Sequence, residues 1–530
     1  MNNLTTPLLT DMYQISMAYG YWKAGTADSD AVFDLFFRKN PFKGEYCIFA
    51  GLKDVMDFVS TYRFCDDDID YLRQLIPQAE EEFFEYMKGL DCSNVKIYAI
   101  AEGTIVFPKE PLIRVEGALI MGQLLETTLL NLVNFPSLIA TNAARMRLVA
   151  GADKKLLEFG LRRAQGPDGA VSASKYAYLG GFDGTSNVLA GKLTGIPVKG
   201  THGHSFVMTS QALSELKSTK LKKLNGEEVE FVSVVLEKLN LLGWENKTNM
   251  GELTAFISFA QAFPKICLAL VDTYDTLKSG VPNFLAVGAA LYDIGYKPVG
   301  IRLDSGDLAY LSREARKMFL DADKLLGKNI FAHCDIVASN DINEEVLLHL
   351  SRGKHEINVF GIGTHLVTCQ SQPALGCVYK LVSINGNARI KLSEEVSKIV
   401  IPCRKNLYRL WGTRPFPLID VMQDSDETPP KVGVQFFCRH PFEENKRATI
   451  FPTRVENLIR LTWDGDRGVI PGTVDTLEAS RLRCLQQLEI MREDHLRPLN
   501  PTPFKVSVSS SMYDRIHEIW MQEAPVAELS

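Results

Sequence analysis

The chain has 530 residues, of which 46% are hydrophobic and 23% are charged, as in ordinary folded globular proteins. A chain of this length is too long to fold around a single hydrophobic core, so we expect two to four domains. The formal net charge of −6 argues against a dedicated nucleic-acid-binding protein, which needs a positive surface. The sequence has neither a signal-peptide pattern at its start nor an apolar run long enough to cross a membrane, so we expect a protein of the cytosol with no membrane partner.

The first part of the chain mixes helical and strand patterns. Residues 8–24 show the spacing of an amphipathic helix, and residues 31–38 show the pattern of a strand. Glycine and proline residues divide 97–116 into short strands. A helical pattern then runs over 119–150, and we expect Pro136 to begin a second helix within it.

From about residue 156, short apolar runs alternate with polar or glycine-rich turns and helical stretches. Apolar strands with little alternation are buried on both faces, as in parallel sheets. About six such units predict either a barrel or a doubly wound sheet, and the absence of a Gly-x-Gly-x-x-Gly fingerprint favours the barrel. In a barrel, functional side chains gather at the carboxyl ends of the strands. The six predicted strands are 157–161, 196–200, 266–271, 298–301, 335–338 and 357–360.

After about residue 377 the strand patterns return, at 377–384 and 388–392. The acidic, proline-bearing segment 422–431 predicts a loop or linker, and 474–493 predicts a helix packed against a larger body. The lysine-rich insertion 211–251 favours a solvated surface loop or helix; the alternative is a mobile flap near phosphates.

Two histidines follow the predicted strand at 196–200. His202 and His204 could be metal ligands at this spacing, but no third ligand is visible nearby in the sequence. A histidine at a barrel mouth can act as a nucleophile or general base. The alternative is a structural histidine bonded to a carbonyl group, and the residues alone leave both open.

Other charged and glycine-rich turns follow the later strands. Arg302 lies beside Asp304 and Asp307; an arginine can fork onto a carboxylate or phosphate, and carboxylates can hold ribose hydroxyls or Mg²⁺. A surface ion pair is the alternative. The run 361–364 has the composition of a phosphate nest or of an ordinary turn. Arg162 lies near the first strand end and could be either a phosphate ligand or a helix-cap or ion-pair residue. Together, the histidine, the arginines, the carboxylates and the glycine-rich run suit a phosphorylated, anionic substrate bound with Mg²⁺.

At this point the motifs are similar to those of a known family. The chain resembles the eukaryotic-type nicotinate phosphoribosyltransferases from about residue 7 to residue 508. The segments that carry the resemblance are 7–14, 140–145, 160–169, 178–183, 186–191, the His204 motif, 302–307 and 361–364.

The resemblance implies a reaction and a fold. Nicotinate and phosphoribosyl pyrophosphate would give nicotinate mononucleotide and pyrophosphate, coupled to ATP hydrolysis, with Mg²⁺ or Mn²⁺ required. The fold implied is an irregular, TIM-like α/β barrel with a flanking α/β sandwich domain, in a homodimer whose subunits share active sites. The implied domains are a sandwich at 1–120, completed by about 385–450, a catalytic barrel at 121–384, and a C-terminal extension at 451–530.

The resemblance also implies roles for single residues. His204 is similar to the histidine that ATP phosphorylates transiently. Arg302 is similar to the arginine that holds the pyridine ring and its carboxylate, and Tyr13 to an aromatic contributed by the partner subunit; Thr201 lies where the family contacts nicotinate. The residues that would bind phosphoribosyl pyrophosphate are Arg162, Asp304, Gly361, Gly363, Thr364 and Asp272.

Two positions bear on substrate choice and on the assignment of the histidine. The related nicotinamide-using family has an aspartate near Ser186, which would repel nicotinate, so Ser186 favours the acid over the amide. Where the family has alanine before the histidine, this chain has Gly203, which should loosen the loop, and an additional His202 precedes it. The alternatives kept are a nicotinamide phosphoribosyltransferase and a ligand-binding member without catalysis.

Overall fold

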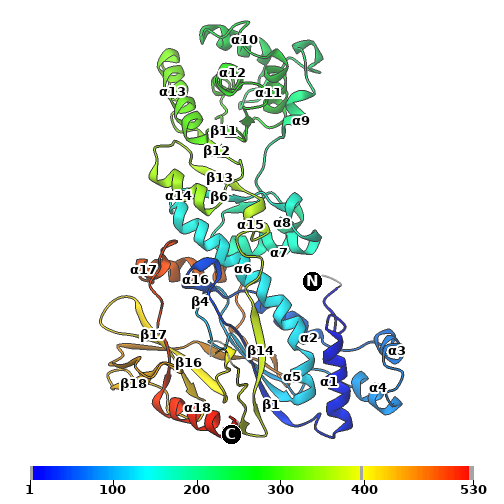
Figure 1. Cartoon of the computed structure of the whole chain (residues 1–530). Coiled ribbons are helices and arrows are strands. Elements are labelled where there is room, and N and C mark those ends of the chain that lie inside the picture. Colours follow the sequence, from blue (N-terminus) through cyan, green and yellow to red (C-terminus); the bar gives the residue numbers. More distant parts are fainter. Residues whose placement is uncertain (1–3, 394, 396–397, 525–530) are drawn as a thin grey trace, which may run out of the picture. The chain divides into compact units, whose positions relative to one another are not determined.

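The computed structural model describes residues 4–393, 395 and 398–524, and these form two compact units (Figure 1). The first unit takes the described residues up to Ala144, Leu179–Gly181, and those from Ser371 onward; the second takes Arg145–Tyr178 and Phe182–Gln370. The predicted limits at 120, 384 and 450 differ from these units. The C-terminal region is not set apart from the first unit, because it supplies strands to that unit's sheets.

The second unit is built on a six-stranded parallel sheet in the order β10-β11-β12-β13-β6-β7. Five of the six predicted strands are present, and the predicted strand at 196–200 is reduced to a single bridge between Val198 and Thr185. The α/β fold class is confirmed, whereas closure into a TIM-like barrel stays a prediction. The strands are β6 (Lys155–Glu158), β7 (Gly184–Thr185), β10 (Leu268–Leu270), β11 (Gly300–Leu303), β12 (Asp335–Ala338) and β13 (Val359–Ile362).

Helices follow the strands of this sheet, as expected for parallel connections. Several begin at a side-chain cap: Asp307 accepts a hydrogen bond from the backbone of Tyr310, and Asn187 accepts one from Ala190. The polar turns after the strands therefore also start the next helices. The main helices are α7 (Gly166–Leu179), α8 (Val188–Thr194), α11 (Met250–Ala262), α12 (Val281–Asp293), α13 (Leu308–Leu326) and α14 (Glu344–Arg352).

The insertion at 211–251 forms a short hairpin and a helix, β8 (Leu221–Lys222), β9 (Glu228–Val229) and α10 (Phe231–Leu241), and α10 packs against α12. Two of its lysines form ion pairs: Lys220 lies 3.6 Å from Glu228, and Lys223 lies 2.8 Å from Glu227. This matches the predicted surface structure. The flap alternative stays a prediction.

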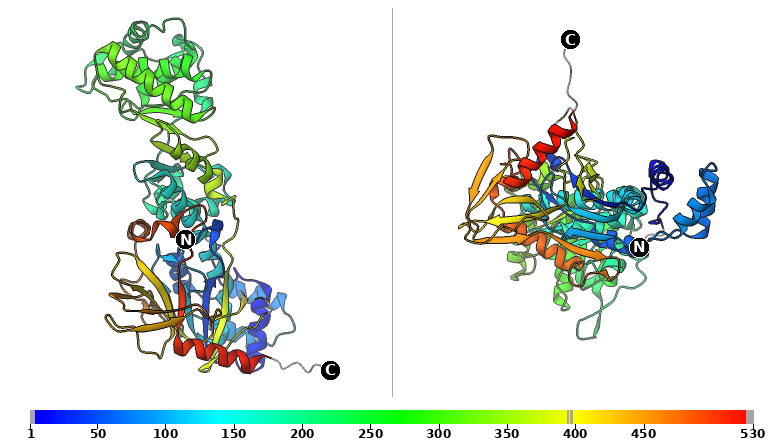
Figure 2. Two further views of the ribbon diagram at one scale, coloured as in Figure 1. Left: turned by 60° about the vertical axis from the view of Figure 1, so that its left-hand side comes forward. Right: turned by 90° about the horizontal axis from the view of Figure 1, so that it is seen from below.

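The first unit contains two larger sheets. The seven-stranded sheet has the order β15-β14-β1-β5-β3-β21-β22, and the six-stranded sheet has the order β19-β18-β23-β17-β16-β20. Figure 2 shows the orange strands of the second sheet beside the blue and yellow strands of the first. The bounds are β1 (Asp30–Phe37), β3 (Lys96–Ile100), β5 (Ile113–Ala118), β14 (Cys377–Ile384), β15 (Asn387–Ala388), β16 (Lys405–Trp411), β17 (Pro417–Asp424), β18 (Phe436–Arg439), β19 (Arg447–Ile450), β20 (Arg454–Asn457), β21 (Ile459–Asp464), β22 (Gly468–Val469) and β23 (Val506–Ser509).

Most predicted elements of the first unit are confirmed. The predicted helix at 8–24 is α1 (Met12–Lys23), and the predicted helix at 474–493 is α16 (Leu477–Ile490). The predicted loop at 422–431 is wrong over its first three residues, which belong to β17 and pair with β16. Among the described residues no helix combines the length and apolarity that a membrane span requires.

The prediction that Pro136 begins a helix is also wrong. The helical run breaks earlier, between α5 (Leu119–Leu124) and α6 (Glu126–Ala150), and Pro136 lies inside α6. Proline cannot donate to the carbonyl four residues before it, here that of Leu132. Gly51 packs against this carbonyl so closely that a Cβ there would lie 1.9 Å from its oxygen. The helix therefore continues past Pro136, with a glycine of another segment covering the place where a hydrogen bond is missing.

Candidate active site

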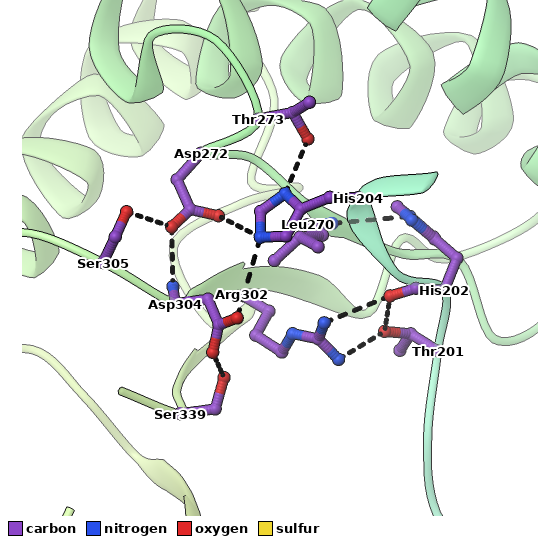
Figure 3. Close-up of polar contacts among 10 residues, drawn as sticks. All are labelled: Thr201, His202, His204, Leu270, Asp272, Thr273, Arg302, Asp304, Ser305 and Ser339. Carbon is purple, nitrogen blue, oxygen red and sulfur yellow. Dashed lines mark hydrogen bonds and ion pairs between the residues drawn. The ribbon is translucent and has the colours of Figure 1, made fainter. Parts of the chain in front are cut away.

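The carboxyl ends of the parallel strands meet at one edge of the sheet, and the predicted site residues of the second unit lie around it. Asp272 follows β10, Asp304 follows β11 and Ser186 follows β7. These residues are far apart in the sequence, but the pairing of the parallel strands brings the strand ends side by side. Figure 3 shows the group formed around His204.

His204 is the first residue of the short helix α9 (His204–Met208), and its side chain is 40% exposed. Its Nδ1 lies 3.0 Å from the hydroxyl of Thr273. Its Nε2 lies 3.6 Å from a carboxylate oxygen of Asp304 and 3.9 Å from one of Asp272. One ring nitrogen thus meets a hydroxyl group and the other faces two carboxylates (Figure 3). The exposed part of the side chain leaves the ring accessible to a ligand.

The two carboxylates are held in place by the strand ends. Asp272, whose side chain is 2% exposed, accepts hydrogen bonds from the backbone N–H of Asp304 at 2.9 Å and from the hydroxyl of Ser305 at 2.5 Å. Asp304 accepts from the hydroxyl of Ser339 at 2.6 Å. Strands β10, β11 and β12 are therefore linked through these side chains, which fixes the carboxylates relative to His204.

His202 is buried, and its ring is held by packing and a backbone contact within the second unit. The backbone N–H of Leu270 donates to its Nε2 at 3.4 Å, and its ring packs against Phe206, Phe256 and Phe259. Burial lowers the pKa of His202 to about 4, so the ring is neutral at neutral pH. The two histidines, which are separated by Gly203, therefore have different environments: His202 packs within the unit, and His204 faces the strand-end cluster.

Arg302 lies at the end of β11 with hydrogen bonds to neutral oxygens. Its guanidinium donates to the hydroxyl of Thr201 at 3.3 Å and to the carbonyl of His202 at 3.1 Å. Burial lowers the pKa of Arg302 below its ordinary value, against the opposing effect of Asp304 and Asp272. A partly desolvated guanidinium whose hydrogen bonds go to neutral oxygens is suited to an anionic ligand, because a bound carboxylate would form a stronger, charge-assisted hydrogen bond with it.

The site has the materials for a divalent cation without forming a complete protein cage. In the described part of the chain, no three histidine, cysteine or acidic residues group as metal ligands. Mg²⁺ needs no such cage, since it is commonly held by one or two carboxylates together with substrate phosphates and water. Asp272 and Asp304 supply hard oxygen ligands, and one oxygen of Asp272 is buried without a hydrogen bond from the described residues. These residues fit a magnesium ion that arrives with a phosphorylated ligand.

The remaining predicted residues of the second unit lie around the same edge. Gly363 precedes the one-turn helix α15 (Thr364–Val367), and Ser186 donates its backbone N–H to the carbonyl of Glu158 at 2.9 Å. Arg162 is exposed, and its charge contributes to the lowered pKa of Arg302. Gly361 lies within β13.

Gly361 has a packing reason to be glycine, because a Cβ there would lie 2.4 Å from the ring of Phe159. Tyr13 belongs to the first unit, near the start of α1, and it is 48% exposed. Burial raises the pKa of Tyr13 above its ordinary value, with the charge of Glu126 adding to the effect. The nicotinate contact of Tyr13 stays a prediction.

Three residues of the cluster were not among the predicted site residues: Thr273, Ser305 and Ser339. Each directly follows a strand or lies within the next turn, so the rule that groups strand-end side chains could have included them. Their hydroxyl groups gave no sequence signal of their own, because serine and threonine are common in any turn.

A buried network lies behind the strand end that carries Asp272. Glu252 accepts hydrogen bonds from Ser279 at 2.5 Å and from Asn283 at 3.1 Å. Burial raises the pKa of Glu252 to about 7. Gly280, in the π-helical turn before α12, packs directly on Val271, so this turn and the strand end are in close backbone contact.

Comparison with known proteins gives one consistent result. Family models for the N-terminal domain of nicotinate phosphoribosyltransferase, for the nicotinate phosphoribosyltransferase family and for its C-terminal domain match residues 8–134, 154–410 and 404–515. Nicotinate phosphoribosyltransferase 2 of Arabidopsis thaliana is 56% identical, over 100% of this chain and 96% of the relative. The human nicotinate phosphoribosyltransferase is 42% identical, over 98% and 97%. The crystal structure of human nicotinic acid phosphoribosyltransferase superimposes with a TM-score of 0.87 at 41% identity, covering 96% of this chain and 99% of that one.

Proposed function

The chain belongs to the nicotinate phosphoribosyltransferase family and is a phosphoribosyltransferase of NAD biosynthesis, and we propose that it couples this transfer to ATP hydrolysis through His204. The observation that carries the proposal is the accessible imidazole between Thr273 and the carboxylates of Asp272 and Asp304. A histidine nucleophile needs an exposed ring whose orientation is fixed by neighbours, and His204 meets both conditions.

In the transfer step the lone pair of the pyridine nitrogen forms a bond to C1 of the ribose. The bond from C1 to the pyrophosphate oxygen breaks, and pyrophosphate leaves with that electron pair. The chain contributes by holding the two reactants in line and by stabilising charge, since bringing reactants together in the right orientation removes much of the entropic barrier.

Arg302 would hold the carboxylate of nicotinate. It is a desolvated cation whose observed hydrogen bonds go to neutral oxygens, and Thr201 next to it offers a hydroxyl group. Ser186 lacks the negative charge that would repel the acid. Tyr13 is proposed to pack on the pyridine ring from a second subunit of a homodimer in the cytosol.

The phosphorylated substrate would lie along the strand ends that face Arg302. Asp304 and Asp272 are proposed to meet the ribose hydroxyls. The phosphates would be bound by the exposed Arg162 and by the segment from Gly361, at the end of β13, through Gly363 to Thr364, at the start of α15. When bound, Mg²⁺ (or Mn²⁺) would neutralise phosphate charge beside Asp272 and Asp304, which otherwise repel it.

The ATP step follows from the ring of His204. A neutral ring nitrogen attacks the γ-phosphorus of ATP, the bond to the bridging oxygen breaks, and ADP leaves. The phosphohistidine adds negative charge beside Asp272 and Asp304, which favours rearrangement of the nearby strand-end turns. Hydrolysis of the phosphohistidine then releases phosphate and returns the ring to its first state.

Labelling with ATP that carries ³²P in the γ-position tests this role. The wild-type protein should give an acid-labile, alkali-stable phosphoprotein whose label maps to the peptide containing His204. His204→Ala should abolish the label, whereas His202→Gln, which changes the buried neighbour, should retain it. Label that persists in His204→Ala would overturn the proposal.

A further inference from the structure

A cavity of about 740 Å³ is built entirely from residues of the first unit. Its walls come from β17, from the turn that joins β18 to β19, from the start of β23 and from the segment 107–109. This volume lies in the range of pockets that hold small-molecule ligands, about 300–1,000 Å³. None of the residues assigned to the phosphoribosyl transfer lines it.

The apolar part of the cavity is made of phenylalanine rings. Phe107 and Phe504 stack with their centroids 4.1 Å apart, and Arg409 lies 5.5 Å from the centroid of Phe107. Phe442 is only partly buried, and its ring has the edge of Trp520 at a centroid distance of 6.2 Å. The packed pair makes a rigid wall, and Phe442 offers a ring against which a flat ligand can stack.

The polar part of the cavity carries an excess of positive charge. Four basic side chains line it, against two carboxylates; these are Lys109, Lys446, Arg447, Lys505, Glu45 and Glu443. Glu443 is paired with Lys446 at 2.8 Å. The positive excess stands out in a chain whose net charge is −6, and it favours an anionic ligand.

Lys109 adds a desolvated cation to this lining. Its ammonium donates to the carbonyl of Ile399 at 2.9 Å and lies 5.9 Å from the ring centroid of Phe442. Burial lowers the pKa of Lys109 to about 8, with the charge of Arg38 adding to the effect. An anion in the cavity would stabilise this ammonium group, so binding and protonation of Lys109 would favour each other.

We propose that this cavity binds a nucleotide, with its base against Phe442 and its phosphate between Arg447 and Lys505. An uncharged aromatic molecule would bring no anion to Arg447 and Lys505, and a small aliphatic anion would leave the phenylalanine rings uncovered. A flat ring joined to a phosphate matches both parts of the lining at once. This binding is separate from the proposed ATP step, since it uses other residues and needs no turnover.

Photolabelling with 8-azidoadenosine monophosphate tests the proposal and locates the site. The label should map to the peptides that contain Phe442 or Lys505, and adenosine monophosphate should compete for it. The double variant Arg447→Glu/Lys505→Glu should weaken this labelling at least tenfold. Both side chains are exposed, so the fold should be kept, as a thermal melt would check.

Two control variants sharpen the result. Lys431→Glu changes an exposed charge of the same unit outside the cavity and should leave labelling unchanged. His204→Ala should also leave it unchanged, which separates this site from the proposed ATP step. Labelling confined to peptides of the second unit, or labelling that the double variant retains in full, would overturn the proposal. Equal competition by inorganic phosphate alone, or by adenosine alone, would show a simpler ligand and would also overturn it.

Discussion

Replacing Arg302 by glutamine removes the cation proposed to hold the carboxylate of nicotinate while keeping a polar side chain of similar length. A hydrogen bond to a charged group contributes about 1.5–3 kcal/mol, and the proposed contact makes two. Taking about 3 kcal/mol in total, the loss corresponds to a factor of ~100 in kcat/KM, because about 1.4 kcal/mol is a factor of ten. Arg302 also donates to Thr201 and to the carbonyl of His202, so a part of the effect belongs to loop position.

The assay is pyrophosphate release from phosphoribosyl pyrophosphate with nicotinate and, separately, with nicotinamide. Arg302→Gln should lower kcat/KM for nicotinate about a hundredfold and change kcat/KM for nicotinamide much less, since the amide carries no charge for Arg302 to pair with. Lys297→Gln changes an exposed side chain three residues before β11; it is the matched control and should change neither rate. An equal loss for acid and amide would refute the carboxylate contact and leave only a structural role.

Three further predictions concern stability and specificity. Burial holds the pKa of His202 near 4, below its ordinary value of about 6.5, so between these pH values the unfolded state binds more protons than the folded state. The free energy of unfolding that wild type gains over His202→Gln should therefore be complete above pH 6.5 and fall as the pH is lowered towards 4. Denaturant unfolding at a series of pH values should show a fall of up to about 3 kcal/mol. Gly203→Ala should change the free energy of unfolding by no more than about 0.5 kcal/mol, since an added Cβ meets nothing nearer than 4.0 Å. Gly280→Ala should clearly lower the melting temperature, because its Cβ would lie 1.9 Å from the carbonyl oxygen of Val271. Equal melting temperatures for the two variants would contradict the packing argument. Ser186→Asp should lower the ratio of nicotinate to nicotinamide turnover, and an unchanged ratio would remove Ser186 from substrate selection.

The parallel sheet could be predicted because its strands are buried on both faces, and such strands have a clear apolar signature. The run at 266–271 predicted β10 within two residues at each end, and 335–338 predicted β12 without error. The prediction of a strand at 196–200 was wrong, because an apolar run does not show how many backbone hydrogen bonds the neighbouring segments will form with it. The prediction that Pro136 begins a helix was wrong for a similar reason, since Gly51, which packs on the turn before Pro136, comes from a distant segment of the chain.

The candidate site was predictable as a set of strand-end residues, but its geometry was not. The rule for parallel sheets placed His204, Asp272 and Asp304 at one edge, and the structure brings them within 4 Å of each other. The different environments of His202 and His204 depend on which ring faces the aromatic cluster, and the sequence His202-Gly203-His204 carries no signal for that. Contacts of Thr273 likewise needed the folded register.

The central claim is that His204 couples ATP to the transfer, and the most direct test is the rate of pyrophosphate release from nicotinate and phosphoribosyl pyrophosphate with and without ATP. For the wild-type protein, ATP should raise this rate. For His204→Ala, with an unchanged thermal melt, the rate should be the same with and without ATP and similar to the wild-type rate without it. Full ATP stimulation in His204→Ala would contradict the account.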